Sequence, residues 1–488
     1  MKKMLYIGHN YHNKTKSTEF LIELFKEKYI VEEADHTIYS NDISIQKNLK
    51  NKHYDVIVLF QILPPRSILK DISFESGIFF PMYDGGPNRE DPIWQDYQDF
   101  LIINFSWKMH EELLNKGMNS RYIQYFPKPE NINSWGQEDS AFFWNRVESI
   151  NINTVALLLG SMKIRHLHMH NALDPLCQKK GLKTKWDVEI EESGWVDDKQ
   201  KLLPFIEAAS LYIAPRPYEG IGMGFLEAMA LGRCVIAANN PTMNEYIENG
   251  KTGILYDLNE LKPLAWSDTR QIQKNAYTFI QKGYEQWEKE KWNILTWIEH
   301  PLKYKKNLLF DATVLIDGFI QGGPGKTGIY FTAYNIFSEL LKSSNFNTII
   351  YCEKAKTPAV RDFLHHYFPE YKIPVFSQQS DLSCINVFFS PVFKIPEHIK
   401  DKNWIYKFTM LYDILPLSHP EYFKDNSHPW FFEMLNSINK EDSYFCISQY
   451  TAQEFLKYVP ELCPQQLTVT PLAASPSFRA SKKQFLPN

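Results

Sequence analysis

The chain has 488 residues, the length of about three domains of ordinary size. Its net charge of −4 and pI of about 6.4 offer no basic field to nucleic acid, and no apolar run approaches the ~20 residues that span a bilayer. The six cysteines form no CxxC pair and the N-terminus has only a short apolar run. We therefore expect a cytoplasmic protein without zinc, disulfides or a signal peptide.

Residues 1–135 alternate apolar strands with amphipathic helices, a pattern typical of a parallel α/β domain. The sequence predicts strands at 4–9, 55–60, 78–83, 100–105 and 122–126, and helices at 17–29 and 107–116. Because such sheets bind ligands at the carboxyl ends of their strands, His9, Tyr83 and Asp84 are candidate site residues. Asp84 precedes two glycines, so it is either a turn former or a group that orients or deprotonates a hydroxyl. His9 is either catalytic or an ordinary strand-end histidine.

Residues 136–302 continue the alternation and predict a second parallel α/β domain. The expected strands are 154–159, 186–189, 211–214 and 234–238, and the expected helices are 201–209, 225–231 and 269–300. His166, His168 and His170 alternate without a cysteine or carboxylate partner nearby, so a polar strand edge or helix is favoured over a metal site. Thr242 and Glu245 predict a capping box at the start of a helix.

The stretch 214–257 reads as a strand end, a glycine loop, a helix and a second strand. Glycines let the backbone approach a ligand, and the helix start offers unpaired N–H groups and a positive dipole end that suit phosphate. Glu219 can reach the ligand from the strand end, and Glu227, one turn into the helix, suits a ribose diol. Arg216 is either a further positive group for phosphate or a salt-bridge partner. The loop glycines are Gly220, Gly222 and Gly224.

Three ordered motifs run from Glu219 to Leu255, namely E-G-x-G-x-x-x-L-E-A-M, G-x-x-V-I-A and N-E-Y-I-x-x-G-x-x-G-x-L. This set resembles the donor-binding half of retaining nucleotide-sugar glycosyltransferases of the glycogen-synthase-like family, glycosyl transferases group 1. The resemblance implies a GT-B fold, in which two Rossmann-like parallel-sheet domains face a cleft. It also implies that Glu219 hydrogen-bonds the transferred sugar, that Glu227 binds the ribose and that the loop holds the diphosphate.

Two departures from the family pattern affect the expected site. The family follows the first strand of the donor half with an arginine and a lysine that hold the pyrophosphate. Here Lys163 and Arg165 follow the strand expected at 154–159, at shifted spacing, and are either phosphate ligands or a solvated basic turn. In the first domain Tyr83 stands where the family has a histidine and Asp84 keeps the acid, which leaves the role of Asp84 open. His9 and Tyr83 are the other acceptor-side candidates.

Residues 303–488 begin again with a basic linker, a strand at 307–316, a glycine loop at 322–328 and a helix at 329–342. Gly325, Lys326 and Thr327 invite comparison with the nucleotide-binding P-loop, G-x-x-x-x-G-K-[ST]. That motif needs a glycine at the position of Ile320. A P-loop NTPase or kinase in the third region therefore stays only as an alternative.

Two local patterns of the first domain recur in the third region. Met82-Tyr83-Asp84 recurs as Leu411-Tyr412-Asp413, and Phe105-Ser106 recurs as Ile447-Ser448, each at an expected strand end. This repetition resembles the acceptor-side half of a second GT-B module, with Asp413 as its site candidate. No second donor half follows. We expect either a truncated piece of a two-enzyme polypeptide, whose missing C-terminal half would be a partner, or a half-module used for scaffolding.

The sequence thus predicts an α/β protein with an acceptor-side domain at 1–135, a donor-binding domain at 136–302 and an incomplete second module at 303–488. The expected activity is transfer of a hexose from a nucleotide diphosphate sugar to a growing saccharide, for example an O-antigen or capsule. No D-x-D motif follows a strand, so we expect no essential metal and no cofactor besides the donor substrate. The expected acceptor is a saccharide or lipid-linked saccharide, the latter implying peripheral membrane contact. A catalytically silent carbohydrate-binding or scaffold protein on the same fold is the alternative.

Overall fold

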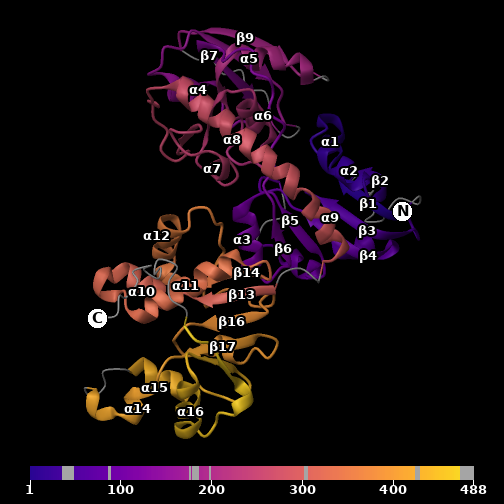
Figure 1. The fold of residues 1–488 in the computed structure, drawn as a ribbon. Helices are drawn as coiled ribbons and strands as arrows, with labels where there is room; N and C mark the ends of the chain where they lie inside the picture. The colour runs from indigo at the N-terminus through magenta and orange to yellow at the C-terminus, as the bar shows by residue number, and fades with distance from the viewer. Residues whose placement is uncertain are drawn as a thin grey trace, which may run out of the picture. The chain divides into compact units, whose positions relative to one another are not determined.

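The computed structural model describes residues 1–35, 49–85, 90–174, 177, 186–196, 199–301, 306–423 and 429–472. The chain divides into two compact units, unit 1 (Met1–Leu113 and Met118–Leu302) and unit 2 (Leu114–Gly117 and Lys303–Asn488). Unit 1 holds two six-stranded sheets and unit 2 holds one seven-stranded sheet (Figure 1). Gly86 and most of the basic linker expected at 303–306 lie outside the described residues.

The first sheet of unit 1 is parallel and has the order β2-β1-β3-β4-β5-β6. Its strands are β1 (Lys2–Gly8), β2 (Tyr29–Asp35), β3 (His53–Phe60), β4 (Ser73–Phe80), β5 (Leu101–Asn104) and β6 (Ser120–Tyr122). Its helices are α1 (Asn10–Thr15), α2 (Glu19–Lys26) and α3 (Trp107–Asn115). Because β4 and β5 are neighbours, the turn with Asp84 and the start of α3 lie at the same edge of the sheet. The strand expected at 122–126 lies earlier in the chain, because β6 shares only Tyr122 with that range.

The second sheet of unit 1 is also parallel and has the order β12-β11-β10-β7-β8-β9. Its strands are β7 (Gln137–Asn145), β8 (His166–Asn171), β9 (Glu189–Gly194), β10 (Ala209–Ile213), β11 (Cys234–Ala238) and β12 (Ile254–Tyr256). Its helices include α4 (Ile152–Leu159), α5 (Leu203–Ala208), α6 (Met223–Ala230) and α7 (Met243–Tyr246). The strand expected at 186–189 begins only at Glu189.

The strand expected at 154–159 is wrong, because this segment is helix α4. The Asn151 side chain accepts hydrogen bonds from the backbone N–H groups of Asn153 (3.0 Å) and Thr154 (3.4 Å), so a capping box starts a helix here. A short apolar run of this kind suits a buried helix face as well as a buried strand. The first strand of this sheet is instead β7. Its first half is polar, so the sequence pattern did not indicate a strand there.

The long helix expected at 269–300 is two helices, α8 (Thr269–Glu290) and α9 (Trp292–Glu299), which return to the first sheet of the unit. The ring of Trp287 lies 5.8 Å from that of Phe20 and 5.1 Å from that of Tyr125. Lys28 and Glu299 form an ion pair at 2.7 Å. The aromatic side chain of Trp287 therefore packs the two domains of unit 1 together.

The sheet of unit 2 is parallel and has the order β15-β14-β13-β16-β17-β18-β19. Its strands are β13 (Lys306–Asp311), β14 (Phe346–Tyr351), β15 (Val375–Phe376), β16 (Val387–Ser390), β17 (Tyr406–Leu411), β18 (Ser443–Cys446) and β19 (Leu467–Val469). Without the edge strand β15, this order repeats that of the first sheet strand for strand. The two local repeats follow matching strands, Asp84 after β4 and Asp413 after β17, and Ser106 after β5 and Ser448 after β18. The topology thus supports the duplication inferred from sequence.

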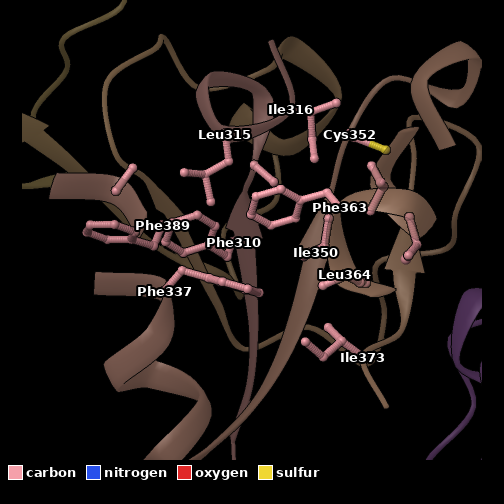
Figure 2. Close-up of a cluster of buried hydrophobic side chains, with 14 of the residues drawn as sticks. Phe310, Leu315, Ile316, Phe337, Ile350, Cys352, Phe363, Leu364, Ile373 and Phe389 are labelled. Carbon is pink, nitrogen blue, oxygen red and sulfur yellow. The ribbon is translucent and has the colours of Figure 1, made fainter. Parts of the chain in front are cut away.

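The core of unit 2 forms where helices cover this sheet. Figure 2 shows Leu315 and Ile316 of α10 (Thr313–Gln321) and Phe337 of α11 (Gly328–Lys342) gathered around Phe310 of β13. The rings of Phe310 and Phe337 lie 5.0 Å apart. The strand expected at 307–316 is therefore too long, because Asp311 ends it. The Asp311 carboxylate accepts hydrogen bonds from the Thr313 backbone N–H (3.0 Å) and hydroxyl (2.6 Å), and these bonds start α10.

The fold confirms the expected α/β class, with two Rossmann-like parallel-sheet domains in unit 1 and a third in unit 2. Among the described residues, no helix is both long enough and apolar enough to cross a bilayer.

Candidate functional site

The glycine loop follows the carboxyl end of β10 and ends at Gly222, the N-cap of α6, whose φ is +81°. A Cβ at Gly222 would lie 2.0 Å from the Phe225 ring, so only glycine fits this turn. A Cβ at Gly220 would lie 2.8 Å from Oδ1 of Asp84, which follows β4 of the other domain. A Cβ at Gly224 would meet the Tyr212 hydroxyl at 3.1 Å. The loop backbone therefore lies against the acid of the first domain.

Four charged side chains meet beside this loop. Arg216, Arg146 and Asp174 follow the neighbouring strands β10, β7 and β8. Arg216 Nε donates to Asp174 Oδ2 at 2.9 Å and Arg146 Nε donates to Asp174 Oδ1 at 2.9 Å. Arg216 also donates from Nη2 to Asp174 and from Nη1 to Asp84, so its guanidinium group pairs with carboxylates of both domains. These side chains are only 11–24% exposed. The cost of removing such ion pairs from water is offset only when their charged groups are also hydrogen-bonded.

Burial and charge set the protonation of this cluster. Burial raises the pKa of Glu219 to about 7, with Asp84 and Asp174 adding to the rise and the two arginines opposing it. Burial likewise raises the pKa of Asp84 above its usual value, against the pull of Arg216. Although burial lowers the pKa of Arg216, Glu219 and the two aspartates more than offset that effect. When Glu219 is protonated, the positive charges of Arg146 and Arg216 equal the negative charges of Asp84 and Asp174.

Arg146 and Asp174 were not found by sequence reasoning. Arg146 follows β7, a strand that the sequence did not reveal, and its guanidinium lies 4.9 Å from the centre of the Trp144 ring. Asp174 follows β8 without any motif. The only sequence signal for Arg146 was its place two residues after an apolar Phe-Phe-Trp run.

Glu227 lies in the first turns of α6, where it is half-buried. Its negative charge, together with that of Glu219, reaches Tyr212 of β10 and helps burial to raise the pKa of that phenol. Glu227 therefore lies on α6 near the carboxyl end of β10, where the glycine loop begins.

The structure does not bring Lys163 and Arg165 to the loop. They precede β8 and so lie at the amino edge of the sheet, opposite the carboxyl ends that carry Arg216. Both side chains are exposed, and Arg165 pairs with Asp139 near the start of β7 at 3.7 Å. Their expected role in binding the donor depended on a strand at 154–159, which is a helix. The structure thus favours the solvated basic turn.

On the first domain, Tyr83 is half-buried and its ring centre lies 6.1 Å from that of Tyr218 on the glycine loop. His9 is the N-cap of α1 and its Nδ1 accepts from the Tyr11 backbone N–H at 3.0 Å. Tyr83 therefore lies beside the loop, whereas His9 caps α1.

A second histidine of the first domain, which the sequence did not single out, carries a polar network. His12 bonds Ser17 Oγ through Nδ1 and Gln61 Oε1 through Nε2, both at 2.6 Å. Burial lowers the pKa of His12, and because Gln61 Oε1 is an acceptor, Nε2 is the donor of that bond. Gln61 follows β3 and has a φ of +65°, and its amide nitrogen faces Gly85, beside Asp84. No spacing in the sequence joins His12 to Gln61.

The three alternating histidines lie on β8, which is an inner strand of the sheet, so the expected polar strand edge or helix is wrong. His166 and His168 also have carboxylate partners on β9, Glu189 at 3.1 Å and Glu191 at 3.4 Å. His168 and His170 both bond the Ser193 hydroxyl, at 2.9 and 2.8 Å, and burial lowers the pKa of His170 to about 4. In the part of the chain that the structure describes, no three His, Cys, Asp or Glu side chains are grouped to hold a metal ion.

The candidates of unit 2 lie in ordinary structural positions. Asp413 is exposed and its Oδ1 accepts from the Leu415 backbone N–H at 3.2 Å. Lys326 Nζ donates to the Tyr367 hydroxyl at 2.9 Å, and Thr327 is the N-cap of α11. The glycine loop with Gly325 joins helix α10 to helix α11. A P-loop joins a strand to a helix, so the nucleotide-binding alternative for this loop is wrong.

The comparisons with known proteins agree with the geometry of unit 1. Residues 157–269 match the family described as glycosyl transferases group 1. No curated protein matches the chain.

Several solved structures are similar to the chain. TarM is 17% identical with a TM-score of 0.37, over 49% of this chain and 54% of TarM, so the chain spans about half the length of that protein. Sucrose-phosphate synthase from Thermosynechococcus elongatus is 12% identical with a TM-score of 0.42, over 62% of this chain and 99% of that one. The lipopolysaccharide outer core galactosyltransferase WaaB is 11% identical with a TM-score of 0.38, over 59% and 99%. These structural likenesses are too weak to assign an activity.

The matched segment contains Arg216, Glu219, the loop glycines and Glu227. The resemblance drawn from these motifs is therefore confirmed for this segment, because residues 157–269 match the family described as glycosyl transferases group 1.

Proposed function

We propose that unit 1 transfers a hexose from a nucleotide diphosphate sugar to a saccharide, with retention of the anomeric configuration. The observation that carries this proposal is that the family segment brings Arg216 and Gly220, the residue after Glu219, against Asp84 of the other domain. Donor groups and acceptor groups must meet in this way for direct transfer between two substrates.

The donor would lie along β10 and α6. The backbone at Gly222 and Gly224 and the N–H groups that open α6 would receive the diphosphate, because a helix start is a favourable anion site. Glu227 would bind the ribose from the helix side, and Glu219 would accept a hydrogen bond from a hydroxyl of the transferred sugar.

Leaving-group stabilisation would come from Arg216 and Arg146 without a metal ion. Arg216 already donates two hydrogen bonds to the Asp174 carboxylate, from Nε and Nη2, and Arg146 donates one from Nε. Guanidinium groups that bind a carboxylate also suit phosphate oxygens. A bound diphosphate would replace part of the carboxylate contacts of Arg216. The charge that develops on the departing phosphate would then meet preorganised donors.

On the acceptor side, Asp84 would orient the attacking hydroxyl or receive its proton. Its raised pKa supports this role, because a carboxylate with a higher pKa is a stronger base. The Gln61 amide, held by His12, would add a hydrogen-bond donor at the same edge.

We further propose that the product is a bacterial surface polysaccharide such as an O-antigen or capsule, built on a saccharide or lipid-linked acceptor. The support is the repeated first-domain topology of unit 2, because a chain with two transferase-like modules fits a repeating polymer.

A thermal-shift screen against UDP, GDP, ADP and dTDP sugars tests the donor part of the proposal. A ligand at about 100 times its dissociation constant adds roughly 2.7 kcal/mol of stability, a measurable shift. The bound sugar nucleotide is then used in a transfer assay with EDTA, and the anomeric configuration of the product is read by NMR. We expect turnover in wild type, turnover in the exposed control Glu248→Ala, and none in Glu219→Ala. Binding without turnover in wild type would instead favour the silent carbohydrate-binding alternative.

A further inference from the structure

One carboxylate in unit 1 caps two helices that belong to different domains. Glu245 lies in the capping box of α7, where its Oε1 accepts from the Thr242 backbone N–H at 3.4 Å. The same side chain accepts from the first backbone N–H groups of α3, Trp107 to Oε2 at 2.6 Å and Lys108 to Oε1 at 3.0 Å. The Ser106 hydroxyl donates to Oε1 at 2.9 Å. A negative charge at this positive helix end is favourable.

Thr242 continues this contact into the glycine loop. Its hydroxyl donates to the backbone carbonyl of Glu219 at 2.6 Å, and its side chain is fully buried. Its φ of +75° is unusual for a β-branched residue, and such a conformation persists only where the surroundings hold it. Strained backbone of this kind clusters at functional sites.

Two more contacts hold α7 on the first domain. Gln124 Nε2 donates to the Glu245 carbonyl at 3.2 Å, and the Tyr246 hydroxyl donates to the Tyr125 carbonyl at 3.0 Å. The chain of bonds therefore runs from α3 and the segment after β6, through Glu245 and Thr242, to Glu219. The helix α3 follows β5, the neighbour of β4, and Asp84 lies in the turn after β4.

We infer that Glu245 and Thr242 are positioning residues. They couple the position of α3 in the first domain to the backbone conformation of the loop that contains Glu219 in the second domain. This inference rests on the proposed function for its catalytic meaning. The coupling sets the position of Glu219 relative to Asp84, although neither Glu245 nor Thr242 touches a reacting atom.

Hydrogen exchange on the full chain tests the coupling directly. In Glu245→Ala, we expect at least tenfold faster exchange both at the amides of Trp107 and Lys108 and across residues 220–226. In Thr242→Val, a nearly isosteric change, only 220–226 should exchange faster, because the cap on α3 remains. Thr242→Ser keeps the hydroxyl and should restore wild-type exchange in the loop. The control Glu248→Ala removes an exposed carboxylate three residues further on and should change neither segment.

Kinetics give the second measurement. Thr242→Val should lower kcat at least tenfold and leave the KM for the donor within about twofold, because the donor site itself is intact. Thr242→Ser should recover most of kcat. If Glu245→Ala does not fold, Glu245→Gln replaces it, since its amide oxygen still accepts from α3 while the charge is lost.

Two results would overturn the inference. One is fast exchange at Trp107 and Lys108 in Glu245→Ala with wild-type exchange across 220–226, which would make Glu245 a local cap only. The other is an unchanged loop and unchanged kcat in Thr242→Val. If wild type transfers no sugar at all, the proposed function fails, but the exchange measurements still decide whether the two segments are coupled.

Discussion

The guanidinium of Arg216 donates to the carboxylate of Asp84, and this ion pair joins the second domain of unit 1 to the first. Asp84 also lies against Gly220, the first glycine of the loop that follows Arg216. The ion pair and the backbone of the glycine loop therefore both contact Asp84, between the two sheets of the unit. A substrate that engages Arg216 must alter this contact, so the pair links donor binding to the acceptor side.

Replacing Arg216 by methionine should reduce both transfer and stability. The change leaves Asp84 and Asp174 without a shared partner, which should cost about 2 kcal/mol of unfolding free energy, below the range for fully buried pairs because the carboxylates are 11–12% exposed. Loss of one preorganised donor to the leaving diphosphate should lower kcat about 100-fold. Urea unfolding and the transfer assay measure the two effects.

A second substitution separates these effects. Adding Asp84→Asn to Arg216→Met removes one of the uncompensated charges and should recover part of the stability. Activity should stay low. Full recovery of activity in the double variant would contradict the role given to Arg216.

Transfer should depend on pH through Glu219. Burial raises the pKa of this carboxyl to about 7, with Arg216 and Arg146 opposing and Asp84 and Asp174 adding to the rise. Below pH 7 the group is protonated and cannot accept a hydrogen bond from the sugar as a carboxylate. We expect kcat/KM to rise as pH increases through about 7 and then to level. In Glu219→Gln the low residual activity should show no inflection near pH 7, and an inflection that persists would assign the titration to another group.

The part of the fold that the sequence predicted best is the stretch around the glycine loop. The strand expected at 234–238 is β11 residue for residue, and the helix expected at 225–231 is α6 within two residues. This stretch contains glycines at required positions, a capping box and short apolar strands. Each of these features depends on residues close together in the chain, so the sequence pattern predicts them.

The remaining site residues depend on contacts between distant segments. Arg146, Asp174 and Arg216 meet because β7, β8 and β10 are neighbours in the sheet, an order that no local pattern encodes. The helix α4 illustrates the same limit. Its apolar run suits either a strand or a buried helix, and the Asn151 cap decides for the helix.

Gly220→Ala should displace the loop from Asp84. The added Cβ would lie 2.8 Å from both Asp84 Oδ1 and Met82 Sδ, closer than real contacts allow, so the loop or the Asp84 and Met82 side chains must move. Because a misplacement of about 1 Å can cost roughly 100-fold in rate, we expect a large loss of kcat and a smaller loss of stability. Gly194→Ala, where a Cβ meets nothing within 4 Å, is the matched control and should leave kcat unchanged. Wild-type kcat in Gly220→Ala would mean that the contact with Asp84 does not matter for transfer.

Arg233 should be a major source of stability in the second domain, although it lies outside the site. It is fully buried and, among the described residues, donates to backbone carbonyls, those of Glu207 (2.7 Å), Ala209 (2.8 Å), Leu231 (2.7 and 3.0 Å) and Ser134. Methionine would fill the space but leave these acceptors without donors, which should cost about 3 kcal/mol or more. Lysine should not rescue, because it lacks the planar set of five donors. Arg270→Met, whose guanidinium lies 5.5 Å from the Trp135 ring centre, should cost less than about 1 kcal/mol in the same urea titration. Equal losses in the two variants would show that the carbonyl contacts of Arg233 contribute nothing beyond its packing.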